Sequence, residues 1–247
     1  MGATFQLLIP YLERVAPAMV LAAAVLWLTR SEPRLRIVIY LFCFILLRDA
    51  MTPLGLWSFG REGWFWIRLS QDPWFLTLFA LGCLTGALGI YFADRENQRY
   101  VVWRGSRWVS GIIVGLLGAG IVVLPLVVIY RSVDVGLRGG ATHDHPILAL
   151  LLFALCGNMM EELLFRGYVL GYFAERMTRL RAGLASGVIF AFGHVFLATT
   201  VTDVGYPLLL FTLWEGCVAG LVAARYGVSA STITHGGAIF LLASQWF

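Results

Sequence analysis

The chain has 247 residues, of which 60% are hydrophobic and only 13% are charged, and its mean hydropathy is +0.81. A typical soluble chain carries about 25% charged residues, so this composition excludes a soluble enzyme and a nucleic-acid-binding domain and predicts an integral membrane protein. All eighteen basic residues behind the net charge of +4 are arginines. The absence of lysine excludes Schiff-base chemistry, Ser/Lys dyads and the phosphate-binding P-loop, each of which requires a lysine amine.

Apolar segments follow one another along the whole chain, separated by charged residues, Pro and Gly. A membrane-spanning helix needs about 20 mainly apolar residues, and eight segments approach this length. We therefore expect an all-α integral membrane protein, built as a bundle of about eight transmembrane helices. The predicted spans are 15–29, 37–57, 73–93, 108–130, 146–165, 182–199, 204–224 and 226–247.

The two parts of the chain are expected to differ in role. Residues 1–145 supply about four helices, together with a segment near 61–72 whose aromatic residues, flanked by charge, suit the headgroup layer. Residues 146–247 supply about four more helices and carry the ionisable motifs described below. Glycine pairs four residues apart let helix backbones approach closely and predict a compact bundle. These pairs are Gly82/Gly86, Gly111/Gly115, Gly183/Gly187 and Gly216/Gly220.

The distribution of arginine predicts the orientation of the bundle. Alternate loops carry twelve arginines on one side and five on the other. Because positively charged loops stay on the cytoplasmic side, both termini are expected outside. The use of arginine without lysine indicates a GC-rich prokaryote, so we expect a multi-pass protein of a prokaryotic cytoplasmic membrane.

A cluster of charged residues lies at the cytoplasmic end of the fifth predicted helix. An ionisable side chain in hydrocarbon costs at least about 2.5 kcal/mol, so each one calls for an explanation. Glu162 and Arg166 are i,i+4 neighbours on a helix and can pair, whereas Glu161 points about 100° away and shares its face with Asn158. Glu161 is therefore free to present its carboxylate to a cavity.

Two histidines on later helices are expected to meet Glu161. His235 lies about nine residues beyond Arg225, and His194 lies about thirteen residues beyond Arg181, so both reach into the bilayer from the cytoplasmic side. One carboxylate and two imidazoles can thus converge in an intramembrane cavity open to the cytoplasm. A buried glutamate can act as a general base on water, and a neutral histidine can orient the water or stabilise an oxyanion.

Taken in order, three motifs resemble those of the CPBP (Abi) family of intramembrane glutamic proteases, which includes the type II CAAX prenyl endopeptidases. They are Glu161-Glu162-x-x-x-Arg166, Phe190-x-x-x-His194, and His235 on the last helix. The resemblance covers residues 146–247 and implies a peptidase without a metal or other cofactor, in which Glu161 and His194 activate the hydrolytic water. We predict that Glu161, His194, His235 and Glu162 form the catalytic group and that Arg166 and Asn158 position it.

The chain departs from the family at one position. The third family motif is His-x-x-x-Asn, but the residue four positions after His235 is Ile239. The amide that would help to stabilise the oxyanion is therefore missing, and Asn158 or Thr234 is a candidate substitute.

Three other functions remain open on the sequence. Ser186, between two glycines, and His235 distantly resemble the Ser/His dyad of rhomboid proteases. Zinc catalysis would use Glu161, His194 and His235 as ligands, although the HExxH pair is absent. A scaffold or immunity protein would keep the fold and bind a peptide without cutting it. The expected partners are a membrane-associated protein or peptide and the lipid bilayer.

Other polar residues carry weaker predictions. Glu215 can line the cavity or simply pack through hydrogen bonds. Arg48 and Asp49 are interpreted as a helix end or a local pair. Outer-loop residues that could form a weak metal patch are more readily interpreted as solvated; they are His143, Asp144, His145 and Asp203.

Overall fold

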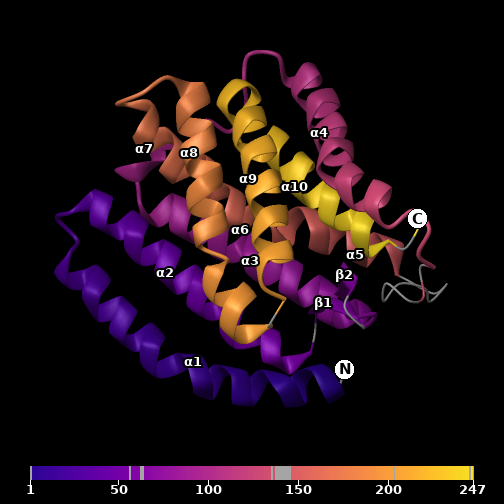
Figure 1. The fold of residues 1–247 in the computed structure, drawn as a ribbon. Coiled ribbons are helices and arrows are strands. Elements are labelled where there is room, and N and C mark those ends of the chain that lie inside the picture. Colours follow the sequence, from indigo (N-terminus) through magenta and orange to yellow (C-terminus); the bar gives the residue numbers. More distant parts are fainter. Residues whose placement is uncertain are drawn as a thin grey trace.

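A computed structural model describes residues 2–55, 57–61, 64–134, 136, 146–202, 204–244 and 246 as a bundle of packed helices (Figure 1). Within these ranges, seven helical segments are long and apolar enough to cross a membrane, and α10 is a shorter apolar helix. The expected all-α membrane fold is therefore confirmed. The first part contains α1 (Gly2–Leu28), α2 (Pro33–Met51), the 3-10 turn η1 (Thr52–Leu54), β1 (Trp57–Arg61), β2 (Trp64–Leu69), α3 (Pro73–Ala93), the 3-10 turn η2 (Asn97–Tyr100) and α4 (Trp108–Ile129).

The second part begins with one long span, Ile147–Ala174, in which α-helical and π-helical segments alternate. The sequence predicts an end near residue 165 because three charged residues interrupt the apolar pattern. The helix continues to Ala174 because Glu162 and Arg166 pair and are buried within the protein. The elements are α5 (Ile147–Leu152), η3 (Phe153–Gly157), α6 (Met159–Glu161), η4 (Glu162–Val169), α7 (Leu170–Ala174), α8 (Arg179–Phe192), η5 (Leu197–Val201), α9 (Tyr206–Tyr226) and α10 (Val228–Ala243).

The segment expected near 61–72 includes most of an antiparallel β-hairpin formed by β1 and β2. Phe65, Trp66 and Ile67 are buried, and the indole Nε1 of Trp66 donates a hydrogen bond to the carbonyl oxygen of Leu242 at 3.0 Å. These aromatic and aliphatic side chains therefore contact the protein core. The sequence did not predict the strands, because the buried face of the hairpin is defined by α9 and α10, far along the chain.

Glycines bring α8 and α9 into backbone contact. A Cβ atom built on Gly220 would lie 2.2 Å from the carbonyl oxygen of Gly183, and one built on Gly187 would lie 2.6 Å from the backbone of Gly216. Real Cβ atoms do not approach backbone this closely. The glycine pairs of these two helices therefore set the distance between α8, which leads to His194, and α9, which carries Glu215.

We expect Gly220→Ala to destabilise the protein by about 1 to 3 kcal/mol or more, because the added methyl group forces the two helices apart. Gly120→Ala is the matched control, since nothing among the described residues lies within 4 Å of the added Cβ and alanine favours a helix over glycine. Thermal unfolding of the purified variants measures the difference. Equal stability of the two variants would contradict this account of the contact.

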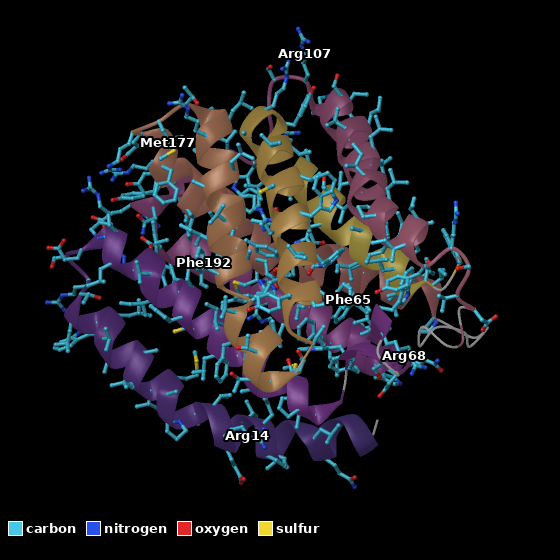
Figure 2. The ribbon with its side chains drawn as sticks, viewed as in Figure 1. Arg14, Phe65, Arg68, Arg107, Met177 and Phe192 are labelled. Carbon is cyan, nitrogen blue, oxygen red and sulfur yellow. The ribbon has the colours of Figure 1, made fainter. Side chains whose placement is uncertain are left out.

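The arginine-rich connections lie together at one end of the bundle. Figure 2 shows Arg107 and Met177 at the top of the view, whereas Arg14 and Arg68 lie below and to the right. Four groups of residues, 30–36, 94–107, 172–181 and 224–229, touch one another at the first end. The contacts that join them are Arg36 with Asp94, Arg34 with the ring of Tyr172, Gly105 with Tyr226, and Arg179 with Ala224.

Candidate active site

A cavity of about 630 Å³ lies inside the bundle, between the N-terminal helices α1–α3 and the later spans. Most of its wall is apolar. Glu161, His194 and His235, which the sequence predicts to converge, all line it. The side chains with hydrogen-bonding groups among its described lining residues are those of Tyr11, Arg48, Trp57, Cys83, Asn158, Glu161, His194, Thr212, Glu215 and His235.

Glu161 lies at the last position of α6, between the two π-helical segments. Its side chain faces the cavity together with that of Asn158, which lies three residues earlier as the helical spacing predicts. The residue is 8% exposed, and its buried Oε2 atom accepts no hydrogen bond from any described residue. A buried carboxylate oxygen without a donor is costly, and it is available to a water or substrate atom in the cavity.

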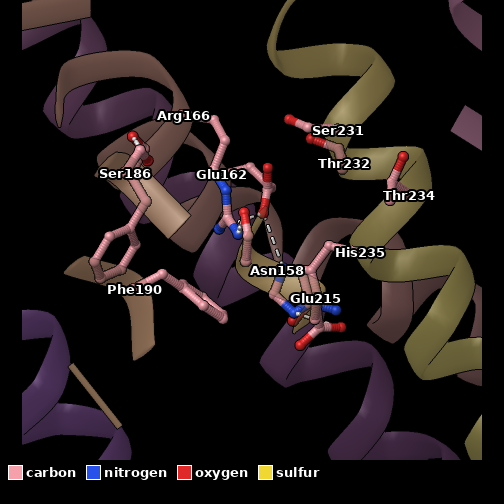
Figure 3. Close-up of polar contacts among 12 residues, drawn as sticks. Asn158, Glu162, Arg166, Ser186, Phe190, Glu215, Ser231, Thr232, Thr234 and His235 are labelled. Carbon is pink, nitrogen blue, oxygen red and sulfur yellow. Dashed lines mark hydrogen bonds and ion pairs between the residues drawn. The ribbon is translucent and has the colours of Figure 1, made fainter. Parts of the chain in front are cut away.

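Glu162 is turned away into an ionic group and is not among the described lining residues of the cavity. Its Oε1 atom lies 2.8 Å from Nη1 of Arg166 and accepts a hydrogen bond of 2.9 Å from Nδ1 of His235 (Figure 3). The guanidinium of Arg166 also lies 4.2 Å from the centre of the Phe190 ring. Glu162 and Arg166 have no exposed side-chain surface. The expected i,i+4 pair is thus present, and it holds His235 of α10 against the fifth span.

His194 has both ring nitrogens engaged. Nδ1 lies 2.8 Å from the carbonyl oxygen of Phe190, and Nε2 lies 3.0 Å from Nη1 of Arg48. A carbonyl oxygen can only accept and a guanidinium can only donate. Nδ1 therefore carries the proton, and Nε2 accepts from Arg48. The imidazole is neutral in this arrangement, with its one basic nitrogen facing the arginine.

Arg48 is a residue of the site that the sequence interpretation missed. It pairs with Asp49 as expected, but it also donates from Nη2 to the carbonyl oxygen of Gly193 at 2.6 Å and lines the cavity. The available signal was an arginine in the middle of an apolar span, since such a charge marks a functional contact by default. The local pair with Asp49 accounted for the charge without a role in the cavity.

Glu215 of α9 lies on the other side of His235 from Glu162. It is 2% exposed, lines the cavity, and places Oε1 3.7 Å from Nε2 of His235. That distance is too long for a hydrogen bond. Among the described residues Oε1 has no hydrogen-bond donor, so Glu215 contributes a second carboxylate to the cavity.

The two candidate substitutes for the missing amide differ in position. Thr234 donates its hydroxyl to the carbonyl oxygen of Gly115 or Ala230, both at 3.2 Å, and the described lining residues do not include it. Figure 3 shows its side chain on the side of α10 away from His235. Asn158 lines the cavity but donates from Nδ2 to the carbonyl oxygen of Ala154 at 2.6 Å. The proposal of Thr234 as an oxyanion donor is therefore wrong in this geometry.

Two alternative mechanisms require contacts that differ from those observed. Ser186 is fully buried, donates to the carbonyl oxygen of Phe165 at 2.7 Å, and is absent from the described cavity lining. His235 donates to Glu162. Within the ranges that the structure describes, no three His, Cys, Asp or Glu side chains are grouped as metal ligands. The loop residues His143, Asp144, His145 and Asp203 lie outside the described residues.

Comparison with known protein families finds a match in the second part of the chain. Residues 143–241 match the family described as "Type II CAAX prenyl endopeptidase Rce1-like". The match covers less than half of the chain and includes the three motifs that carry the site residues. No curated protein and no solved structure matches the chain. The resemblance drawn from the motifs is therefore confirmed over residues 143–241, which form the Rce1-like part of this chain.

Proposed function

We propose that this protein is an intramembrane glutamic endopeptidase that hydrolyses a peptide bond of a membrane-associated protein or peptide. The observation that carries the proposal is the difference between two adjacent carboxylates. Glu162 is held by Arg166 and His235, whereas Glu161 faces the cavity with a buried oxygen that no described donor reaches. A carboxylate in that position is suited to take a proton from water.

The proposed reaction begins with a water molecule held between Glu161 and the substrate carbonyl. Glu161 removes one proton as the water oxygen bonds to the carbonyl carbon, and the π electrons of the carbonyl move to its oxygen. When this tetrahedral intermediate collapses, the carbon–nitrogen bond breaks and the protonated Glu161 returns its proton to the leaving nitrogen. The products are one carboxyl group and one amine, and the glutamate is regenerated.

The other side chains have positioning or polar roles in this proposal. His194 is fixed in one tautomer by the carbonyl oxygen of Phe190, so that Nε2 faces the reaction. His235 is held by Glu162 and lines the same cavity. Arg166 neutralises Glu162 and keeps that carboxylate from competing with Glu161. The mainly apolar wall lowers the local dielectric, which strengthens the electrostatic interactions inside.

The site and the matched family both support a class of substrate. The family is described as one of CAAX prenyl endopeptidases. For this chain we propose a membrane-embedded peptide as substrate, because the cavity lies within the helical bundle and has mainly apolar walls.

We further propose that the arginine-rich end of the bundle is cytoplasmic and that both chain termini lie outside. A reporter fused after Phe247 is expected to lie outside the cytoplasm, and a reporter inserted near Asn97 is expected to lie inside it. The reason is that loops rich in arginine stay on the cytoplasmic side. Paired phosphatase and fluorescent-protein fusions measure this. The opposite pattern would reverse the side from which substrate reaches Glu161.

Quantitative proteomics of protein termini tests the function even while the substrate is unidentified. Cells producing the wild-type protein are compared with cells producing Glu161→Ala at equal membrane abundance. New termini in membrane-associated proteins are expected only with the wild-type protein. Identical termini in the two samples would refute the proposal.

A binding-only function is the second candidate, and two observations favour it. The family asparagine is replaced by Ile239, and the basic nitrogen of His194 accepts a hydrogen bond from Arg48. Such a protein would hold a peptide in the cavity without cutting it. It would capture the same membrane peptide in the wild-type and Glu161→Ala forms, with no change in termini.

A further inference from the structure

Arg48 stands out because it brings a full positive charge into the cavity from α2, outside the region that matches the family. Only 10% of its side chain is exposed. A buried arginine is expensive within a bilayer and usually faces a functional cavity. Pairing with Asp49 reduces the cost but does not explain why the guanidinium also reaches a histidine 146 positions away.

The contacts of Arg48 fix one edge of its guanidinium and direct the other. Nε and Nη2 lie 2.8 Å from Oδ1 of Asp49, and Nη2 also donates to the carbonyl oxygen of Gly193 at 2.6 Å. Nη1 alone is directed at Nε2 of His194, at 3.0 Å. Asp49 and Gly193 therefore fix the plane of the guanidinium, and Nη1 is left pointing toward His194. A donor preorganised in this way can stabilise a developing negative charge.

The opposite wall of the cavity lacks a donor where the family motif has one. Ile239 lies one helical turn beyond His235 on α10 and lines the cavity with an apolar side chain. The hydroxyl of Thr234 faces α4, and one N–H of Asn158 is used within its own helix. Among the described residues that line the cavity, Arg48 is the one with a permanent positive charge.

We propose that Arg48 is a catalytic residue that binds the scissile carbonyl oxygen and stabilises the oxyanion, replacing the amide that is absent at Ile239. This inference rests on the proposed peptidase function. Nε2 of His194 is the nitrogen that would hold the attacking water. The carbonyl attacked by that water lies about 3 to 3.5 Å away at the start of the reaction, within reach of the Nη1 donor beside it.

A change of hydrogen-bond acceptor at Nη1 of Arg48 links substrate binding to water activation. In the structure, Nη1 of Arg48 donates to Nε2 of His194 and occupies its lone pair. A substrate carbonyl placed beside Nη1 offers the donor a competing acceptor. The hydrogen bond of Nη1 then passes to that oxygen, and Nε2 becomes free to accept from water. As the water oxygen bonds to the carbon and its proton passes to Glu161, the negative charge develops beside the guanidinium.

The test combines removal of the arginine with restoration of the amide. Arg48→Met is expected to lower kcat by about a hundredfold or more, the usual effect of losing one oxyanion donor, with KM changed by less than about threefold. Adding Ile239→Asn to Arg48→Met is expected to recover at least about tenfold, since the new amide supplies a donor. Rates are measured on a quenched-fluorescent peptide spanning a cleavage site found by the proteomics of termini.

Controls separate this inference from the proposed function and from simple unfolding. Arg34→Met removes an exposed arginine from the same helix and is expected to keep the wild-type rate. If Arg48→Met does not fold, Arg48→Lys replaces it, and the same rescue by Ile239→Asn is required. Loss without rescue in a folded variant, or an unchanged kcat, would assign Arg48 to structure alone. Cleavage that persists in Glu161→Gln would instead refute the peptidase mechanism itself.

Discussion

Replacing Glu161 with Gln is expected to lower the rate of peptide cleavage by a hundredfold or more and to leave the fold intact. Loss of a general base costs about 10² to 10⁴ in rate. Glutamine is nearly isosteric and neutral, and the carboxylate that it replaces makes no ion pair among the described residues. The measurements are the cleavage rate in lipid nanodiscs and the thermal unfolding of the same preparation. An active Glu161→Gln protein would contradict the glutamic mechanism.

The histidines refine this first prediction. His194→Ala is expected to match the loss of Glu161→Ala, because it removes the nitrogen that holds the water. His235→Ala is expected to lower the cleavage rate less than His194→Ala does. His235 lies one helical turn from Ile239, where the amide of the family motif is already missing. A variant of His194 with the wild-type rate would remove it from the water-activating pair.

Controls distinguish the glutamic mechanism from the two alternatives. Ser186→Ala is expected to keep most activity, because the hydroxyl donates to a backbone carbonyl and lies outside the described cavity lining. A fluorophosphonate is expected not to label Ser186, and a strong chelator is expected not to inactivate the protein. Covalent labelling of Ser186, or zinc-dependent recovery after chelation, would overturn the assignment.

Arg166→Ala is expected to reduce both stability and activity. Removal of one partner from a buried pair costs about 3 to 5 kcal/mol, because the other charge remains in the interior. Here the stranded group is Glu162, and the stacking of Arg166 on Phe190 and the support for His235 are lost with it. Folded yield and thermal unfolding in detergent measure the first effect, and the cleavage rate measures the second.

Arg176→Ala is the matched control for this variant. Arg176 pairs with Glu175 at 3.5 Å, but both side chains are more than 40% exposed, and such surface pairs contribute about 0 to 1 kcal/mol. Its unfolding temperature is expected to stay close to that of the wild type. Equal losses of stability in Arg166→Ala and Glu161→Gln would contradict the division of roles between the two glutamates.

Much of the fold follows from the sequence, because the insertion of a helix into a membrane depends on the apolar composition of that segment alone. Seven of the eight predicted spans correspond to helices long enough to cross a bilayer, and the eighth corresponds to the shorter helix α10. The Glu162 and Arg166 pair was predictable for the same reason, since i,i+4 neighbours meet within one helix whatever surrounds it. The cavity position of Glu161 and Asn158 follows from that local geometry as well.

The remaining features depend on contacts between distant segments. The fifth helix passes the predicted end because its charges find partners on the helix itself and on α10. The aromatic segment forms a hairpin because α9 and α10 bury one of its faces. Sequence patterns contain apolarity and spacing, but they do not contain the partners that make a buried charge acceptable.

The sequence by itself determined that this is a helical membrane protein, and it predicted that Glu161 and two histidines share a cavity. Only the tertiary structure decided which atoms of those groups are available. The rotation of α2 brings Arg48 to Nε2 of His194, whereas α8 turns Ser186 to a carbonyl oxygen and α10 turns Thr234 toward α4. Helix packing across the bundle sets these directions. In an apolar medium the backbone hydrogen bonds of a helix form within the helix itself, so its rotation about its axis is decided by contacts with neighbouring helices.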